Sequence, residues 1–150
     1  MKAVVQRVKQ ASVRVEGEFV SDIQGGLLIL LGISPEDDKK DIDWLAAKIA
    51  NLRIFNDENQ VMNQSLIEVG GDALIVSQFT LLASTKKGNR PSYTRAAKPE
   101  IAIPLYREFI TAFESLTGKK VGTGLFGADM KIDLCNDGPV TIVIDTKNRI

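Results

Sequence analysis

The segment Ser77-Gln78-Phe79-Thr80 places hydroxyl and amide side chains in an otherwise apolar run, residues 73–83. A row of hydrogen-bonding groups at the end of a strand can border a pocket, and its backbone N–H groups can hold an oxyanion whatever the side chains are. The simpler interpretation is a half-exposed strand whose polar side faces water. Thr80 is a candidate nucleophile, but a threonine hydroxyl needs an adjacent base.

The supply of bases in this chain is limited, because its 150 residues include no histidine. Ser-His-Asp and Cys-His catalysis are therefore excluded, as are the zinc sites built on imidazole. A general base must be a carboxylate, a lysine, a terminal amine or a group that the substrate brings. The single cysteine, Cys135, excludes an internal disulfide and suits a reducing compartment.

Charge is balanced overall, with 19 basic and 19 acidic residues, so contact with a nucleic acid must come from a local patch. The basic segment 84–98 is such a patch, because no acidic residue falls between Asp72 and Glu100. Its cations are Lys86, Lys87, Arg90, Arg95 and Lys98. A charge run is usually a solvated surface, but phosphate binding is the functional alternative, since phosphate contacts dominate affinity for nucleic acids.

Two further segments contain glycine. Residues 122–130 have three glycines but lack the Lys-Ser/Thr of a P-loop, and no helix pattern follows, which excludes a nucleoside-triphosphate loop. Phe126 and Met130 in this segment are candidates for a pocket wall or for the core. Gly138-Pro139 precedes an alternating run, and because proline in sheets is confined to edges, first positions and bulges, the pair alone suggests a turn into a strand.

The elements that must position these residues are mostly strands. We expect strands at 2–9, 11–16, 19–23, 26–33, 73–83, 129–137 and 140–145, and amphipathic helices at 34–55 and 99–116. The run 26–33 is continuously apolar and predicts a strand buried on both faces. This order favours one α+β domain over residues 1–150, with a mixed or largely antiparallel barrel-like sheet and two main helices.

Without a signal-peptide pattern or a membrane-length apolar run, a soluble cytoplasmic protein is expected.

Two motifs together point to a family. "SQFTL" at 77–81 and "NDGPVT" at 136–141 resemble the two defining motifs of the D-aminoacyl-tRNA deacylases (the D-Tyr-tRNA deacylase family), the second usually written Asn-x-Gly-Pro-x-Thr. The likeness also covers "MKAVVQRV", "GLLILLGI", "GNRPSYT" and "GLFGADM", and so nearly the whole chain. It implies a homodimer that hydrolyses the ester between a D-amino acid and the terminal adenosine of tRNA. No cofactor and no metal site is expected.

The resemblance also implies roles for individual residues. Gly138-Pro139 would be cis and would enter the partner's active site, where its two carbonyl oxygens gauge the chirality of the substrate. Arg7 would brace that dipeptide. The remaining matches are the catalytic residues Gln78, Phe79 and Thr80, which would face the ester and the adenosine, and the substrate-binding residues Ser77, Phe126 and Met130, the last two near the adenine.

An editing enzyme for many D-amino acids can recognise only what its substrates share, namely the ammonium, the ester, the α-hydrogen and the ribose. A rigid backbone wall on the side of the L substituent then rejects L-aminoacyl-tRNA, whereas glycine has no side chain to clash, so cleavage of Gly-tRNA is expected. For the missing base, the preferred hypothesis is assistance by the neighbouring ribose hydroxyl, and the rival is covalent catalysis by Thr80. A non-catalytic tRNA- or RNA-binding module, with residues 84–98 as its phosphate patch, is the alternative of a different class.

Overall fold

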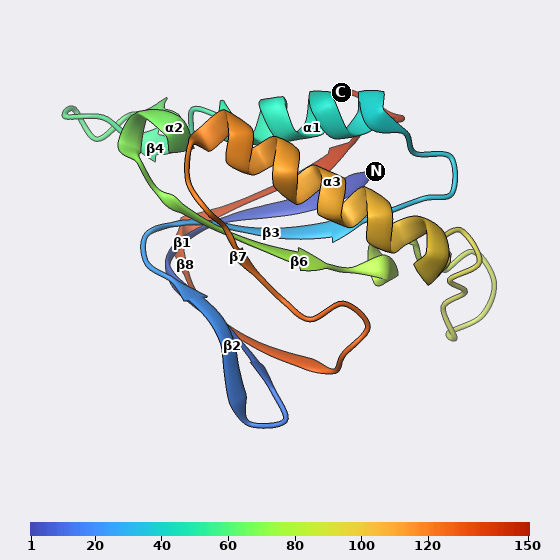
Figure 1. The fold of residues 1–150 in the computed structure, drawn as a ribbon. Coiled ribbons are helices and arrows are strands. Elements are labelled where there is room, and N and C mark those ends of the chain that lie inside the picture. Colours follow the sequence, from blue (N-terminus) through green and yellow to red (C-terminus); the bar gives the residue numbers. More distant parts are fainter.

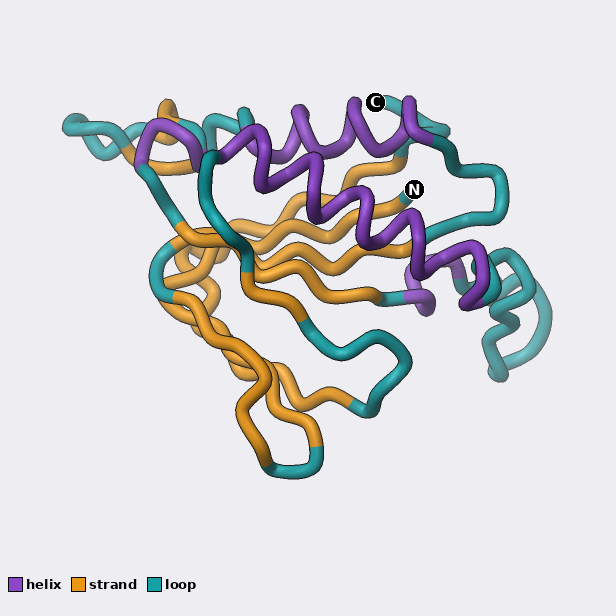
Figure 2. The backbone as a smooth tube through the Cα atoms, viewed as in Figure 1, coloured by secondary structure: helices purple, strands orange, loops and turns teal.

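The sheet is built around one long strand, β1 (Lys2–Val15). In the computed structural model, which describes residues 1–150, the first half of β1 pairs antiparallel with β3 (Gly26–Gly32) and its second half with β2 (Glu18–Ile23). β8 (Met130–Asp145) runs antiparallel along the other edge of β1. β6 (Asp72–Ser77) then lies parallel to β3, and β7 (Gly122–Thr123) lies parallel to β6. The result is a mixed six-stranded sheet that curls toward a barrel (Figures 1 and 2).

The other elements are a small hairpin and four helical segments. These are α1 (Lys39–Ala50), β4 (Phe55–Asn56), β5 (Met62–Gln64), α2 (Leu66–Val69), the 3₁₀ helix η1 (Phe79–Leu82) and α3 (Pro99–Thr117). α1 and α3 pack on each other and cover one face of the sheet, while β2 and the ends of β1 and β8 extend away from them (Figure 1). None of the helices combines the length and the apolar character needed to cross a lipid bilayer.

β3 is buried on both of its faces, as its uninterrupted apolar sequence predicts. Leu27, Ile29 and Leu31 belong to the larger core between the sheet and the two long helices. Leu28 points the other way, into a smaller core that contains Val13 and Leu74. Because successive side chains of a strand alternate between its faces, a strand between two cores needs apolar residues at every position.

α3 is attached to the sheet by its buried face. Phe109 and Phe113 are fully buried, and the Tyr106 hydroxyl donates a hydrogen bond of 2.6 Å to the Ile75 carbonyl oxygen of β6. Burial raises the pKa of Tyr106 to about 12, although a backbone hydrogen bond with Gly124 acts in the opposite direction. The phenol is therefore protonated at neutral pH and keeps this tie between helix and sheet.

The predicted α+β class, the barrel-like mixed sheet and the two main helices are confirmed, but several boundaries were wrong. Residues 2–9 and 11–16 form one strand, as do 129–137 and 140–145, because β1 and β8 pair along nearly their whole lengths. The first helix starts at Lys39, where the side chain of Asp38 caps it by accepting from the Lys40 and Asp41 N–H groups. The β4–β5 hairpin and α2 were not expected.

Candidate active site

A pocket of about 240 Å³ opens where β6 ends, between η1 and the segment that leads into β8. Its lining is mostly apolar. Five of the residues that the sequence singled out line it: Ser77, Gln78, Phe79, Phe126 and Met130. The first three come from the end of β6 and the start of η1, and the last two lie some fifty positions further along the chain. The fold therefore brings the polar segment and the glycine-rich segment together at one cavity.

The polar segment reaches the pocket because the chain turns sharply after β6. The Gln78 N–H donates to the Leu31 carbonyl oxygen at 2.8 Å, and η1 then crosses the end of β3 above Gly32. A β-carbon at Gly32 would lie 2.6 Å from a methyl group of Leu82 and 3.0 Å from the Gln78 carbonyl oxygen. The missing side chain of Gly32 therefore permits the turn. The predicted strand over 73–83 was wrong beyond Ser77 for this reason.

η1 presents its first residues outward. Phe79 is 56% exposed at the edge of the pocket, and its ring meets that of Tyr93 edge-on at 5.1 Å between centroids. The Gln78 side chain donates a hydrogen bond of 2.5 Å from Nε2 to the Thr80 hydroxyl oxygen. Thr80 itself does not line the pocket. Its hydroxyl contacts an amide rather than a base, an arrangement that fixes its position without activating it.

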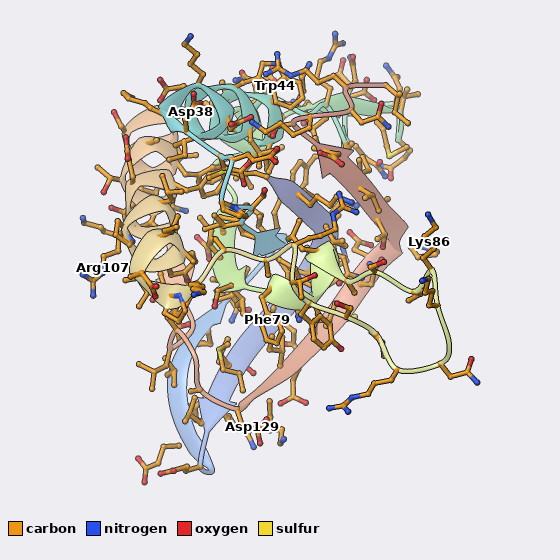
Figure 3. The ribbon with its side chains drawn as sticks, turned by 90° about the vertical axis from the view of Figure 1, so that its right-hand side faces the viewer. Asp38, Trp44, Phe79, Lys86, Arg107 and Asp129 are labelled. Carbon is orange, nitrogen blue, oxygen red and sulfur yellow. The ribbon has the colours of Figure 1, made fainter.

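The opposite wall comes from the segment before β8. The ring of Phe126 packs against Tyr106 at 5.9 Å between centroids, which anchors this wall to α3. Asp129 is the one titratable residue among those lining the pocket, and it pairs with Lys131 at 2.9 Å, with its side chain 85% exposed (Figure 3). No group of three or more Asp, Glu or Cys side chains is arranged to hold a metal ion. The interior of the pocket is therefore uncharged and offers no buried base.

Gly138-Pro139 lies away from this pocket, in a bulge of β8. Gln6 of β1 faces Thr141 and Val8 faces Asn136, so the four residues between Asn136 and Thr141 lie opposite a single residue of β1. The Gly138–Pro139 bond is cis, as the resemblance implied, and both residues are exposed. The Asn136 side chain closes the bulge, since its Oδ1 accepts from the Val140 N–H at 2.9 Å.

Arg7 is the residue of β1 that lies opposite the bulge, and it is buried. Its Nε donates to the Asp137 carbonyl oxygen at 3.0 Å, directly before Gly138. Its Nη1 donates to the Ile54 carbonyl oxygen at 2.6 Å and to Asn56 Oδ1 at 3.3 Å. The guanidinium thus ties the bulge of β8 to the start of the β4–β5 hairpin. The contacts of Arg7 with Ile54 and Asn56 were missed, because nothing local in the sequence links residues so far apart.

The comparisons with known proteins agree with these motifs. The family model described as D-Tyr-tRNA(Tyr) deacylase matches residues 4–145. The chain belongs to this family. A D-aminoacyl-tRNA deacylase from Christiangramia forsetii is 63% identical over 149 residues, and one from Bacteroides thetaiotaomicron is 61% identical, each alignment covering 99% of both chains. The family predicted from the two motifs is thereby confirmed.

Solved structures show the same fold as this member of the deacylase family. One, described as a c-Myc DNA unwinding element binding protein, superposes with a TM-score of 0.90 at 42% identity, covering 97% of this chain and 98% of that one. Another, described as a probable eukaryotic D-amino acid tRNA deacylase, gives a TM-score of 0.81 at 18% identity, covering 95% and 97%. The second likeness concerns the fold alone.

The two family motifs thus occupy different places in this deacylase-family chain. Ser77, Gln78 and Phe79 of the first motif line the pocket, and Thr80, which does not line it, accepts a hydrogen bond from the Gln78 side chain. Gly138 and Pro139 of the second motif do not line it. Within one chain, the structure therefore provides a pocket and, elsewhere, an exposed backbone projection.

Proposed function

We propose that this protein hydrolyses the ester linking a D-amino acid to the terminal adenosine of tRNA. The observation that carries the proposal is the pocket, which joins the strand-end residues Ser77, Gln78 and Phe79 to the apolar wall at Phe126 and Met130. An apolar cavity with a few polar groups at one side suits an adenosine with an acyl ester. Family membership and the names of the relatives support the same reaction. Because aminoacyl-tRNA is made and used in the cytoplasm, we expect the protein to act there.

The hydrolysis is assisted by the substrate. Asp129 is solvated and paired to Lys131, so the enzyme brings no buried base to the pocket. The neighbouring ribose hydroxyl orients the attacking water. Because this hydroxyl and the ester belong to the same ribose, the hydroxyl is already held near the reacting carbonyl, which lowers the entropic cost of the reaction. Phe79 and Thr80 begin η1, where N–H groups have no partner within the helix, and these donors hold the oxyanion of the tetrahedral intermediate.

Thr80 is then a positioning group, and its removal tests this assignment. Thr80→Ala should retain most of the deacylation rate, because the oxyanion donors belong to the backbone and the proton acceptor belongs to the substrate. A substrate whose terminal adenosine lacks only the neighbouring hydroxyl should react poorly with both enzymes. Capture of an ester between the amino acid and Thr80 would contradict this mechanism and would favour covalent catalysis.

The chirality gauge is supplied by a second copy of the chain. Gly138 and Pro139 are exposed and do not line their own pocket, which supports insertion into the pocket of a partner. β8 pairs only with β1, so its other edge has unpaired backbone groups, and Leu134 and Val143 on this strand are 38% and 71% exposed. An open edge with exposed apolar residues is suited to pairing with another chain.

The deciding experiment compares D-Tyr-tRNA, L-Tyr-tRNA and Gly-tRNA as substrates of the purified protein and of a Gly138→Ala variant. The wild type should cleave D-Tyr-tRNA, cleave Gly-tRNA to some degree and leave L-Tyr-tRNA intact. In the variant, a β-carbon would lie 2.8 Å from a methyl group of Val140 and 3.2 Å from Arg7 Nη2, at a φ of +138°. Displacement of the projection should reduce D-Tyr-tRNA cleavage. Robust cleavage of L-Tyr-tRNA by the wild type would disprove the chirality gauge.

A non-catalytic nucleic-acid-binding function is the second candidate. The basic segment favours it, as does a structural neighbour whose name refers to a DNA element. Such a module would bind uncharged RNA strongly, with a steep dependence on salt, and would leave the ester intact. Turnover of D-Tyr-tRNA with only modest affinity for deacylated tRNA would exclude it.

A further inference from the structure

Five cations of segment 84–98, called the basic loop from here on, have no partner in the protein. Their side chains are exposed, and none forms an ion pair, a side-chain hydrogen bond or a cation–π contact; they are Lys86, Lys87, Arg90, Arg95 and Lys98. Most other Lys and Arg side chains do form such contacts. Outside the loop, only Lys40 and Arg107 are equally free. The basic loop therefore holds five of the seven Lys and Arg side chains that have no partner in the protein.

The basic loop meets the pocket at two places. It leaves the fold directly after η1, whose Phe79 forms one edge of the pocket and packs against Tyr93 of the loop. It returns at Ala97, which lines the pocket and donates its N–H to the Ile33 carbonyl oxygen at 2.8 Å. The returning end of the loop is thus part of the pocket wall, and Lys86 projects to one side of the pocket residues Phe79 and Asp129 (Figure 3).

The tip of the loop is held at its base but is otherwise free. Ser84 and Ser92 exchange two backbone hydrogen bonds, of 2.8 and 3.0 Å, which we call the serine clasp. Lys86, Lys87 and Arg90 all lie between its two serines. The clasp fixes where the tip starts, and the exposed side chains beyond it can adjust to the positions of an anionic ligand.

We propose that the basic loop binds the phosphodiester backbone of the RNA strand whose last adenosine occupies the pocket. This inference rests on the proposed deacylase function. A cavity of about 240 Å³ has no room for nucleotides beyond the terminal nucleoside and its acyl group, so the rest of the strand must leave across the surface beside the pocket. The chain as a whole is neutral, so the remainder outside the loop has an excess of acidic residues and repels phosphates. The positively charged loop is therefore the part of the surface along which the RNA strand is expected to leave the pocket.

A matched pair of double variants tests this assignment. Lys86→Ala/Arg90→Ala removes one Lys and one Arg from the loop tip, and Lys40→Ala/Arg107→Ala removes the same two types, equally exposed and unpaired, from α1 and α3. Arg107 projects from α3 on the side away from the loop (Figure 3). Each enzyme is assayed with D-tyrosyl-tRNA and with D-tyrosyl-adenosine, which has the ester and the nucleoside but no phosphate.

For the loop variant, kcat/KM with D-tyrosyl-tRNA at low salt should fall about tenfold, mainly through KM, since two phosphate contacts are lost. The slope of log kcat/KM against log salt concentration should become shallower by about 1.5, because each phosphate contact accounts for roughly 0.7 with a single strand and roughly 0.9 with duplex DNA. Hydrolysis of D-tyrosyl-adenosine should be unchanged. The control variant should match the wild type with both substrates.

Two results would overturn the inference. Equal losses of kcat/KM with both substrates would mean that the loop shapes the pocket rather than binding phosphate. Equal kcat/KM values for the loop and control variants would mean that the positive charge of the loop contributes no more to RNA binding than positive charge elsewhere on the surface. Absence of hydrolysis by the wild type would instead refute the proposed function. Fluorescence anisotropy with deacylated tRNA would still decide the role of the loop, because weaker binding by the loop variant alone supports it and equal binding by both variants refutes it.

Discussion

Arg7 and Lys9 both reach the carboxylate of Asp137 at 3.5 Å, but their surroundings differ. The Lys9 side chain is 70% exposed, and an exposed ion pair contributes little to stability. Arg7 is buried and holds the backbone carbonyl groups of Asp137 and Ile54. We predict that Arg7→Ala lowers the free energy of unfolding by about 1 to 3 kcal/mol, because it leaves buried acceptors without donors. Lys9→Ala should change it by less than about 0.5 kcal/mol.

Urea denaturation of the two variants measures this difference in unfolding free energy. Deacylation assays then show whether the loss of Arg7 also affects catalysis. Since Arg7 holds the backbone directly before Gly138, Arg7→Ala should also reduce D-Tyr-tRNA cleavage under conditions where the protein remains folded. Arg7→Lys keeps the charge but cannot reach both carbonyl groups in the same geometry, and it should be impaired as well. Equal unfolding free energies for the Arg7→Ala and Lys9→Ala proteins would refute the bracing role.

At the scale of elements, the start of α1 is joined to the segment after β8 by buried charges. The Met1 ammonium group contacts Asp37 and the Thr146 hydroxyl, and Lys147 Nζ lies 2.7 Å from Asp41 Oδ2. Burial acts to raise the pKa of Asp41, but hydrogen bonds from Lys147, Thr146 and the Asp38 N–H outweigh it and hold this pKa well below its usual range. Asp41 therefore stabilises the fold in its ionised form.

This lowered pKa sets a direction for the dependence of stability on pH. A carboxylate with a depressed folded pKa contributes fully above its unfolded pKa, about 4, and loses its contribution as the pH falls from there toward the folded value. We predict that the wild type loses stability between pH 5 and about 2 more steeply than Asp41→Asn, as thermal unfolding at several pH values would show. Asp43→Asn, which alters only the exposed pair with Lys39, should keep the wild-type profile; a flattened profile there would contradict this account.

The elements themselves were predictable to different degrees. The helical periodicity around Phe109 and Phe113 and the apolar run of β3 are local signals, and both elements appear close to where the sequence placed them. The end of β6 was not predictable, because "FTLLA" is a short apolar run that fits a strand or a helix equally, and the choice depends on packing over Gly32. The pairing of β1 with β8 joins the two ends of the chain, so no local pattern encodes it.

For the whole molecule, the proposed exchange of Gly138-Pro139 between subunits has a direct test. We predict a mass about twice 16.4 kDa in sedimentation experiments, as for a closed two-fold dimer. Gln78→Ala removes a polar side chain that lines the pocket, and Gly138→Ala displaces the projection, so each homodimer should cleave D-Tyr-tRNA more slowly than the wild type. A heterodimer of the two variants, isolated by two affinity tags, has one site with both defects and one with neither, and should recover about half of the wild-type activity.

Recovery depends on the projection acting in the partner's pocket. If Gly138 acted within its own chain, each subunit of the heterodimer would have one defective component and no activity would return. Val143→Glu provides a second measurement, because a charge at the exposed edge of β8 should shift the protein toward the monomer and lower deacylation together with it. A fully active monomer would refute the exchange.

The candidate site as a whole could be assembled from sequence only through the family motifs. Composition excluded histidine chemistry and located the basic loop, and these were statements about single segments. That Phe126 faces Phe79 across a pocket depends on the parallel arrangement of β6 and β7, which periodicity does not specify. The support that Ile54 and Asn56 give to Arg7 depends on a hairpin that was not expected at all.

The serine clasp has a consequence for how such a protein can change over evolutionary time. Because Ser84 and Ser92 close the loop at its base, the residues between them can be replaced or lengthened without disturbing the pocket wall at Phe79 and Ala97. Doubling the length of a flexible loop costs only about 0.6 kcal/mol in closure entropy. Under the proposed roles, the loop can therefore change which RNA it accepts, or be replaced by the loop of another family member, while the proposed chirality gauge at Gly138-Pro139 is inherited unchanged.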